Sequence, residues 1–215
     1  MQIVVTGGLG FIGSHTVVEL QNVGYEVIVI DNLSNSSIDV LGGIERITGK
    51  QPIFEQIDLR EKAAVQAFFA KYTEVTGVIH FAASKAVGES VQNPLLYYEN
   101  NIASLVYLLQ ELQKKPEAHF IFSSSCTVYG QAEVMPIAET TPIQAAMSPY
   151  GNTKQIGEEI IADVTKVSGL NAILLRYFNP IGAHPSTEIG ELPIGVPQNL
   201  VPFITQTGMG LRKEL

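Results

Sequence analysis

The chain alternates between short apolar runs and longer segments in which apolar residues recur every three or four positions. The short runs have the composition of buried β-strands and occupy residues 2–5, 26–30, 53–57, 77–82, 119–123 and 172–177. Helical periodicity follows Ile12 up to a stop at Gly24, and it recurs over residues 60–72, 94–113 and 149–167. This alternation predicts an α/β fold built on a doubly wound parallel sheet with right-handed crossovers.

The pattern changes after residue 177, where glycine and proline become frequent and long periodic segments stop. We therefore expect residues 1–177 to form one domain. Residues 178–215 read as the start of a smaller lobe over the sheet, with too little chain to bury a core of its own. No internal repeat or low-complexity linker separates the two parts.

A glycine-rich segment, TGGLGFIG, joins the first predicted strand to the first predicted helix. Gly7 permits a tight turn, Gly10 lets a diphosphate approach the backbone, and Gly13 lets the helix pack closely on the strand. The positive end of the helix dipole favours an anion at the same place. A loop that merely needs positive φ would also use glycine, but the strand, turn and helix context favours a Rossmann-like dinucleotide site.

The second predicted strand ends in Asp31, which lies 18 residues beyond Gly13. An acid at about this spacing binds the ribose hydroxyls of a dinucleotide. The following segment, DNLSNSS, contains no arginine that could hold a 2′-phosphate. NAD is therefore favoured over NADP.

Composition excludes several classes of function. Charged residues make up only 16% of the chain, which suits a sheet buried on both faces. The net charge of −8 and the lack of a basic cluster argue against a nucleic-acid partner. A single cysteine, Cys126, suits a reducing compartment, and no apolar run is long enough to span a membrane. No signal peptide is evident, so a cytoplasmic protein is expected.

Polar residues follow the third and fourth predicted strands. Asp58 has two readings, either a contact to the adenine amino group or the N-cap of the next helix. Lys85 ends the segment FAASK, and its place at a strand end favours a functional cation over an ordinary surface lysine. The four histidines lack ligand spacing, so no metal site is expected.

The candidate catalytic group combines a hydroxyl cluster with a tyrosine and a lysine. Tyr150 and Lys154 lie four residues apart in a predicted helix and therefore share one face. A nearby cation would lower the pKa of the phenol toward the range of a general base, and a nicotinamide ring would act in the same direction. Ser125 lies in the cluster SSSCTVYG and would hydrogen-bond the substrate oxygen that Tyr150 deprotonates.

These residues together resemble the extended short-chain dehydrogenase/reductase superfamily and, within it, the family of UDP-glucose (UDP-galactose) 4-epimerases. The resemblance runs through nearly the whole chain, in the segments TGGLGFIGSH, DNLSNSS, FAASKAVGESVQNPLLYYENN, SSSCTVYG, SPYGNTK, LRYFNPIGAHPS and VPQNLVPFI. The fourth-strand segment and RYFNPIGAHPS are far more specific than the glycine loop.

The resemblance implies a tightly bound NAD and a UDP-sugar substrate. Tyr150 would take the proton of the 4-hydroxyl while hydride passes to NAD, and the 4-keto sugar would turn over before hydride returns to its other face. The implied cofactor-binding residues are Gly7, Gly10, Phe11, Ile12, Gly13, Asp31, Asn32, Leu33, Ser34, Asn35, Ser36, Asp58, Leu59, Phe81, Ala82, Ala83, Ser84, Lys85, Asn100, Ser125, Tyr150, Lys154 and Phe178. The implied substrate-binding residues are Lys85, Ser125, Tyr150, Asn179 and Asn199.

A homodimer is also expected, from the helix predicted over residues 94–113. Its stripe of Leu95, Tyr98, Ile102, Leu105, Val106 and Leu109 reads first as core. The band is broadened past one buried face by Leu96, Tyr107, Leu108 and Leu112. The extra apolar width favours a contact between two copies, as the resemblance also implies.

Alternatives remain open within this resemblance. The segment Ser125-Cys126-Thr127 offers no carboxylate, which disfavours the dehydratases of sugar nucleotides. An epimerase of UDP-N-acetylhexosamines or UDP-uronates is a second reading. The family's members run well past 300 residues, so the chain reads as truncated at its C-terminus. A catalytically inactive NAD-binding module is the third reading for these 215 residues.

Overall fold

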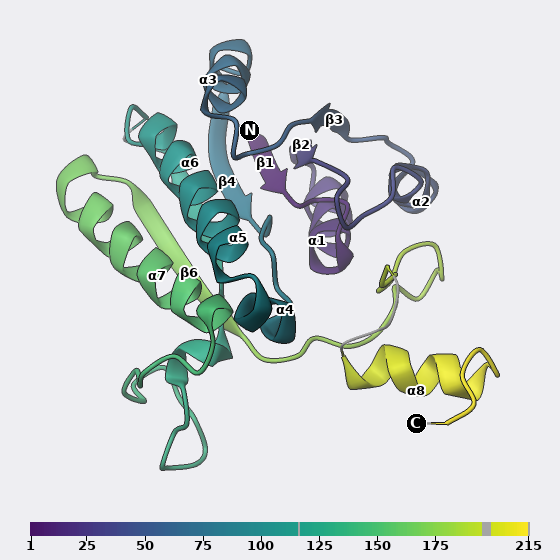
Figure 1. Cartoon of the computed structure of the whole chain (residues 1–215). Coiled ribbons are helices and arrows are strands. Elements are labelled where there is room, and N and C mark those ends of the chain that lie inside the picture. Colours follow the sequence, from purple (N-terminus) through teal and green to yellow (C-terminus); the bar gives the residue numbers. More distant parts are fainter. Residues whose placement is uncertain (116, 195–198, 215) are drawn as a thin grey trace.

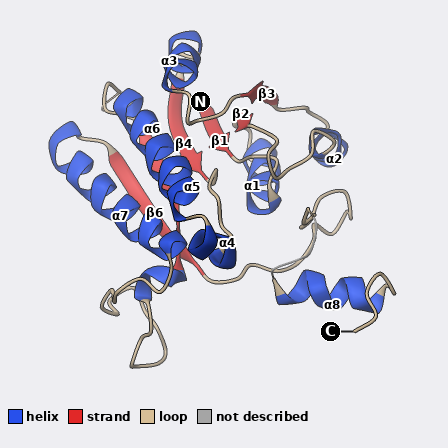
Figure 2. Cartoon of the chain, viewed as in Figure 1, coloured by secondary structure: helices blue, strands red, loops and turns tan. Residues whose placement is uncertain are grey.

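The computed structural model describes residues 1–115, 117–194 and 199–214 (Figure 1). At its centre is a parallel sheet of six strands in the order β3-β2-β1-β4-β5-β6 (Figure 2). The strands are β1 (Gln2–Thr6), β2 (Glu26–Asp31), β3 (Ile53–Gln56), β4 (Val75–His80), β5 (His119–Ser125) and β6 (Asn171–Tyr177). The order reverses between β1 and β4, which confirms the doubly wound sheet and places a ligand crevice beyond the carboxyl ends of those strands.

Helices cover both faces of the sheet (Figure 1). Helices α1 (Phe11–Asn22) and α2 (Val40–Thr48) pack on one face, and α3 (Lys62–Lys71), α6 (Ser104–Leu112) and α7 (Pro149–Ser168) pack on the other. The alternation along each strand sets this division. On β1, Val4 packs in the cluster with Leu105 of α6, whereas Val5 packs in the cluster with Val17 of α1.

Each boundary of the predicted strands lies within two residues of the boundary in the structure. Helix α1 ends in a Schellman motif in which Gly24 adopts φ +91° and donates to the carbonyl of Gln21. The N–H of Tyr25 donates to the carbonyl of Leu20 in the same motif. The predicted stop at Gly24 is therefore confirmed, because only glycine takes this left-handed conformation without strain.

The sequence did not predict every helix, and α2 and α4 are two that it missed. Helix α2 has the sequence VLGGIERIT, and its glycine pair reads as a helix breaker. The structure gives one of these glycines a packing reason, because a Cβ on Gly43 would lie 2.6 Å from the carbonyl oxygen of Glu188. Helix α4 (Val87–Gln92) is too short for its periodicity to be read.

The helix predicted over residues 94–113 is present as α5 (Pro94–Tyr98), a π-helical turn (Glu99–Ala103) and α6. The reading of its apolar band needs correction, because Leu108 and Leu112 are fully buried and cannot meet a partner. Helix α6 packs against the sheet between α3 and α7, so more than one of its faces belongs to the core. Leu95 and Leu96 of α5 remain exposed, Leu95 by 80%.

The chain after β6 crosses the carboxyl ends of the strands toward α1 and α2 (Figure 1). Ile189 is buried in the core cluster of α1 and α2, and Glu188 forms an ion pair with Arg46 of α2 at 2.7 Å. Helix α8 (Leu200–Gly208) follows. The division between residues 1–177 and 178–215 stays a prediction.

Within the part of the chain that the structure describes, no helix combines the length and apolarity needed to cross a membrane.

Candidate active site

The glycine-rich turn lies between β1 and the first turn of α1. Gly7 adopts φ +65°, and a Cβ there would lie 2.8 Å from the backbone nitrogen of Ala82 on the β4 side. A Cβ on Gly13 would lie 2.2 Å from the carbonyl oxygen of Gly7. The roles predicted for Gly7 in the turn and Gly13 in close packing are therefore confirmed. Gly10 is the N-cap of α1, and no side chain caps the N–H groups there.

This turn has the features of an anion site. The first turn of α1 contains no acidic residue, and its N–H groups lack a side-chain acceptor. The helix dipole adds a positive potential at the same end. A diphosphate supplies the acceptors that these N–H groups require, so the turn fits the middle of a dinucleotide.

Asp31 lies at the end of β2 and connects the glycine turn to the loop that follows β2. One carboxylate oxygen accepts a hydrogen bond from the N–H of Leu9 at 3.1 Å. The other accepts from the N–H of Leu33 at 3.0 Å and from the hydroxyl of Ser36 at 2.7 Å. The acid is thus fixed beside the turn, while the ribose contact expected of it stays a prediction.

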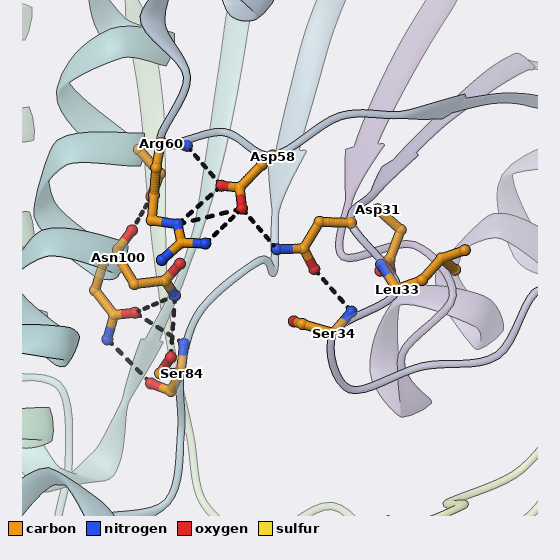
Figure 3. Close-up of polar contacts among 10 residues, drawn as sticks. Asp31, Leu33, Ser34, Asp58, Arg60, Ser84 and Asn100 are labelled. Carbon is orange, nitrogen blue, oxygen red and sulfur yellow. Dashed lines mark hydrogen bonds and ion pairs between the residues drawn. The ribbon is translucent and has the colours of Figure 1, made fainter. Parts of the chain in front are cut away.

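Asp58 forms an ion pair with Arg60 that sequence reasoning missed (Figure 3). The guanidinium donates to both carboxylate oxygens, with the shortest contact at 2.7 Å, and the amide of Asn32 donates to Oδ2 at 3.3 Å. Arg60 holds the pKa of Asp58 at about 2, so the carboxylate is charged at neutral pH. The N-cap reading of Asp58 is wrong, because Glu61 occupies the N-cap of α3.

The loop after β4 is clamped by two asparagines of the π-helical turn. Asn100 donates to the hydroxyl of Ser84 at 3.1 Å (Figure 3). Asn101, which the sequence analysis did not single out, accepts from the N–H of Ser84 at 2.8 Å and donates to its carbonyl at 3.0 Å. It also donates to Thr153 of α7. The only sequence signal was a polar pair inside an apolar stripe.

The other predicted cofactor residues lie at the same end of the sheet, with two qualifications. Leu59 has its side chain in the hydrophobic core, so only its backbone can face a ligand. Phe178 is 60% exposed. The remaining residues of the set follow strand ends or begin α1, and they are Phe11, Ile12, Ser34, Asn35, Phe81, Ala82 and Ala83.

The structure brings the candidate catalytic residues together between β5 and α7. Ser125 is the last residue of β5, and Tyr150 is the second residue of α7. The N-cap Ser148, whose hydroxyl accepts from the N–H of Gly151, fixes the start of this helix. Lys154 follows one turn later and donates to the carbonyl of Ser123 at 2.8 Å. Its Nζ lies 5.7 Å from the centre of the Tyr150 ring.

Burial dominates the ionisation of this group. It raises the pKa of the Tyr150 phenol above its ordinary value, and the hydroxyl of Ser125 offsets part of this effect. Burial also lowers the pKa of Lys154 to about 8. The net pKa of Tyr150 in the protein alone is therefore raised and not lowered as expected, because the burial of the phenol outweighs the hydrogen bond with Ser125.

His80 lies beneath this site in a structural role. Its Nδ1 is 2.7 Å from the hydroxyl of Thr6, and its ring stacks near Phe120 and Phe122. Burial, with the charge of Lys154 as a second cause, lowers the pKa of His80 to about 3, so the ring is neutral. Among the described residues, no cluster of three or more His, Cys, Asp or Glu side chains could hold a metal ion.

Three of the predicted substrate-binding residues, Lys85, Asn179 and Asn199, are exposed. Glu191, which sequence reasoning missed, accepts a hydrogen bond from the amide of Asn199 at 2.7 Å. The same oxygen lies 3.9 Å from the ammonium of Lys85. The structure therefore brings Lys85 and Asn199 together through one carboxylate. Asn179 is exposed, two residues after the end of β6.

Comparison with known proteins identifies a family for this arrangement. Residues 3–196 match the model of the NAD dependent epimerase/dehydratase family. The chain is 49% identical to the UDP-glucose 4-epimerase of Haemophilus influenzae, over all of this chain and 64% of that protein. It is 50% identical to the Bacillus subtilis UDP-glucose 4-epimerase, over all of this chain and 63% of that protein. The chain thus spans less than two thirds of the length of these relatives.

Solved structures resemble the chain equally well. The UDP-glucose 4-epimerase of Bifidobacterium longum in complex with NAD+ and UDP superposes with a TM-score of 0.95 at 45% identity. The Stenotrophomonas maltophila enzyme with bound NAD and formylated UDP-arabinopyranose superposes with a TM-score of 0.94 at 45% identity. Each match covers all of this chain and 64% of the solved chain.

Proposed function

The chain belongs to the NAD dependent epimerase/dehydratase family, and we propose that its protein interconverts UDP-glucose and UDP-galactose by inverting the 4-hydroxyl of the sugar. The observation that carries this proposal is the convergence of Ser125, Tyr150 and Lys154 at the sheet edge that also holds the glycine turn. A proton-transfer group and a dinucleotide cradle at one edge suit oxidation of a sugar alcohol.

The glycine turn would hold the diphosphate of NAD, and Asp31 would bind the adenosine ribose. Asp58 would accept a hydrogen bond from the adenine amino group. The loop fixed by Asn100 and Asn101 would support the nicotinamide half. When bound, NAD supplies the acceptor for the hydride of the sugar C4. The turn fits the cofactor because the first turn of α1 contains no acidic residue and no side chain caps its N–H groups.

Tyr150 would remove the proton of the sugar 4-hydroxyl, and Ser125 would donate a hydrogen bond to the same oxygen. The buried phenol is protonated at neutral pH, so it needs positive charge beside it to become a base. Lys154 supplies one positive charge at the ring. The ammonium would also hold the nicotinamide ribose, which couples cofactor binding to proton transfer.

The substrate would lie over the open side of this group. Lys85, Asn179 and Asn199 are proposed to contact the UDP-sugar, with Glu191 holding Lys85 and Asn199 near each other. The pocket would let the 4-keto sugar turn over between two hydride transfers. Relatives of this chain are named for UDP-glucose, which supports a UDP-hexose over a UDP-uronate.

A second candidate for these 215 residues is an NAD-binding module that turns over little substrate. The observation that favours it is the exposure of Phe178 and Asn179 on the substrate side. Binding energy from the nucleotide part of a substrate is needed to orient its sugar. The chain can be assayed beside the Bacillus subtilis relative, with UDP-galactose and its N-acetyl analogue. Equal turnover by the two proteins would reject the weak-activity reading. Inactivity of this chain toward both substrates, beside an active relative, would support it.

We further propose a homodimer in the cytoplasm, serving galactose metabolism. The exposed Leu95 on α5 supports a contact between copies. Sedimentation of the wild type and Leu95→Glu tests this, because the charge would weaken an apolar interface. A monomeric wild type would reject the proposal.

A further inference from the structure

A buried carboxylate lies one helical turn beyond the proposed active-site residues. Glu158 is on α7, four residues after Lys154 and eight after Tyr150, and is only 6% exposed. Tyr150, Lys154 and Glu158 therefore follow one line along the helix. The function proposed above uses the first two residues and leaves Glu158 without a role.

Glu158 joins three elements of the fold. Its Oε1 accepts hydrogen bonds from the hydroxyl of Ser124 on β5 and from Nε of Arg176 on β6, the latter at 3.0 Å. Its Oε2 accepts from Nη2 of Arg176 at 2.7 Å. Arg176 also donates through Nη1 to the hydroxyl of Tyr129, which follows β5 in the 3-10 helix Cys126–Tyr129.

These contacts set the register between α7 and the end of β5. Lys154 binds the carbonyl of Ser123, and Glu158 binds the hydroxyl of Ser124. Ser125, the next residue of the strand, lies beside the Tyr150 hydroxyl. Three neighbouring residues at the end of β5 are thus each contacted from one of three successive turns of α7, although the order along the strand differs from the order along the helix.

Close packing makes this register sensitive to small displacements. A Cβ added to Gly157, beside Glu158, would lie 2.8 Å from Cζ of Phe122 on β5. The ring of Phe122 therefore packs directly against the backbone of α7 at Gly157, where a larger residue would push it away. A shift of about 1 Å between them would separate Tyr150 from Ser125, and misplacement on this scale costs about a hundredfold in rate.

The stability of the fold does not by itself explain why Glu158 and Arg176 form a buried ion pair at this place. Desolvation of Glu158 and Arg176 offsets much of their attraction, and well-packed apolar residues of the same volume often stabilise a fold equally. An ion pair with fixed hydrogen bonds does, however, specify one arrangement of its elements. The Arg176 fork and the Ser124 hydroxyl together allow one orientation of the carboxylate.

We propose that Glu158 is a positioning residue that, through Ser124 and Arg176, holds α7 in the register at which Tyr150 and Lys154 meet Ser125. The proposal rests on the function proposed above for the meaning of these three residues. Glu158 itself touches neither cofactor nor substrate in this account.

The test compares Glu158→Gln with Ile161→Val, a control on the same helix at a buried position without polar contacts. A carbon-13 label on the tyrosine phenol carbons, assigned with Tyr150→Phe, reports the surroundings of the Tyr150 hydroxyl without cofactor or substrate. We expect Glu158→Gln to displace the Tyr150 signal, and Ile161→Val, which removes one buried methyl group, to leave it in place. In the active protein, kcat should fall about tenfold to a hundredfold with little change in KM.

A double variant, Glu158→Gln with Arg176→Met, separates register from stability. Removing the whole ion pair is expected to recover stability without recovering the Tyr150 signal. The proposal is overturned if Glu158→Gln leaves the signal unchanged, if Ile161→Val displaces it equally, or if the signal recovers in the double variant. The carbon-13 measurement does not depend on turnover, so it would still test this proposal if the epimerase proposal failed.

Discussion

The ammonium of Lys154 lies 5.7 Å from the centre of the Tyr150 ring, and both side chains leave α7 one turn apart. Burial favours the neutral form of each group, because it lowers the pKa of Lys154 to about 8 and raises the pKa of Tyr150. The fold therefore carries a desolvated ammonium at a cost in stability. Such a cost is expected where a charge serves chemistry and not folding.

Lys154→Met should stabilise the fold at neutral pH while weakening NAD binding and turnover. Below pH 8 the lysine is protonated in the folded and unfolded states, so the folded state carries the desolvation cost. Above pH 8 the folded state releases this proton first, and the cost disappears as the pH approaches the unfolded pKa of about 10.4. The gain at pH 7 should be on the order of 1–3 kcal/mol.

Urea unfolding of the wild type and Lys154→Met between pH 7 and pH 10 measures this difference. It should shrink as the pH rises. Lys166→Met is the matched control on α7, since the Lys166 side chain is 70% exposed and should give no such trend. A variant less stable than the wild type at pH 7 would mean that the bond to Ser123 outweighs the desolvation of the ammonium.

Tyr150→Phe should lower turnover of UDP-galactose by at least about a hundredfold, because general base catalysis contributes about 10² to 10⁴ in rate. The phenyl ring keeps the packing around α7, so the dissociation constant of NAD should change little. Steady-state rates and calorimetric titration with NAD give the two quantities. Near-normal turnover would show that another group removes the proton.

The chain should bind NAD at least about tenfold more tightly than NADP, since Asp31 would repel a 2′-phosphate. Asp31→Asn should reduce this ratio of dissociation constants. Arg60→Met should leave the ratio unchanged, because the guanidinium is already paired with Asp58. Calorimetric titration with each dinucleotide gives the ratio, and a wild type that prefers NADP would refute the role given to Asp31.

Gly13→Ala should destabilise the fold by several kcal/mol, because its methyl group would lie 2.2 Å from the carbonyl oxygen of Gly7. Gly88→Ala in α4 is the control, since a Cβ there meets nothing within 4 Å. That change should raise the free energy of unfolding by at most about 1 kcal/mol, through helix propensity alone. Equal effects in thermal unfolding would contradict the close approach of α1 to the turn.

Periodicity and turn chemistry predicted most of this fold. Strands such as β1 and β2 are continuously apolar because they are buried on both faces. This apolar pattern can be read from the sequence alone. Helix α2 was not predicted because Gly43, which reads as a helix breaker, is required there by the approach of the Glu188 carbonyl, a contact made by a segment far along the chain. Helix propensity depends on the local sequence, so it does not reveal such a contact.

The candidate site divides in the same way. Gly7, Gly13 and the Tyr150–Lys154 spacing could be read from the sequence, since each follows from one local element. Asn101 and Glu158 could not, because their partners come from other elements brought close only by folding. The direction in which the Tyr150 pKa shifts could not be predicted either, since it depends on how deeply the start of α7 is buried.

The most direct test of the epimerase account uses UDP-galactose carrying deuterium at C4 of the sugar. The protein is loaded with NAD and used in excess over substrate, so that one slow turnover per molecule is enough for detection. The account predicts UDP-glucose that retains deuterium at C4, and loss of this conversion in Tyr150→Phe. Deuterium released to water, or no conversion at all under these conditions, would contradict it.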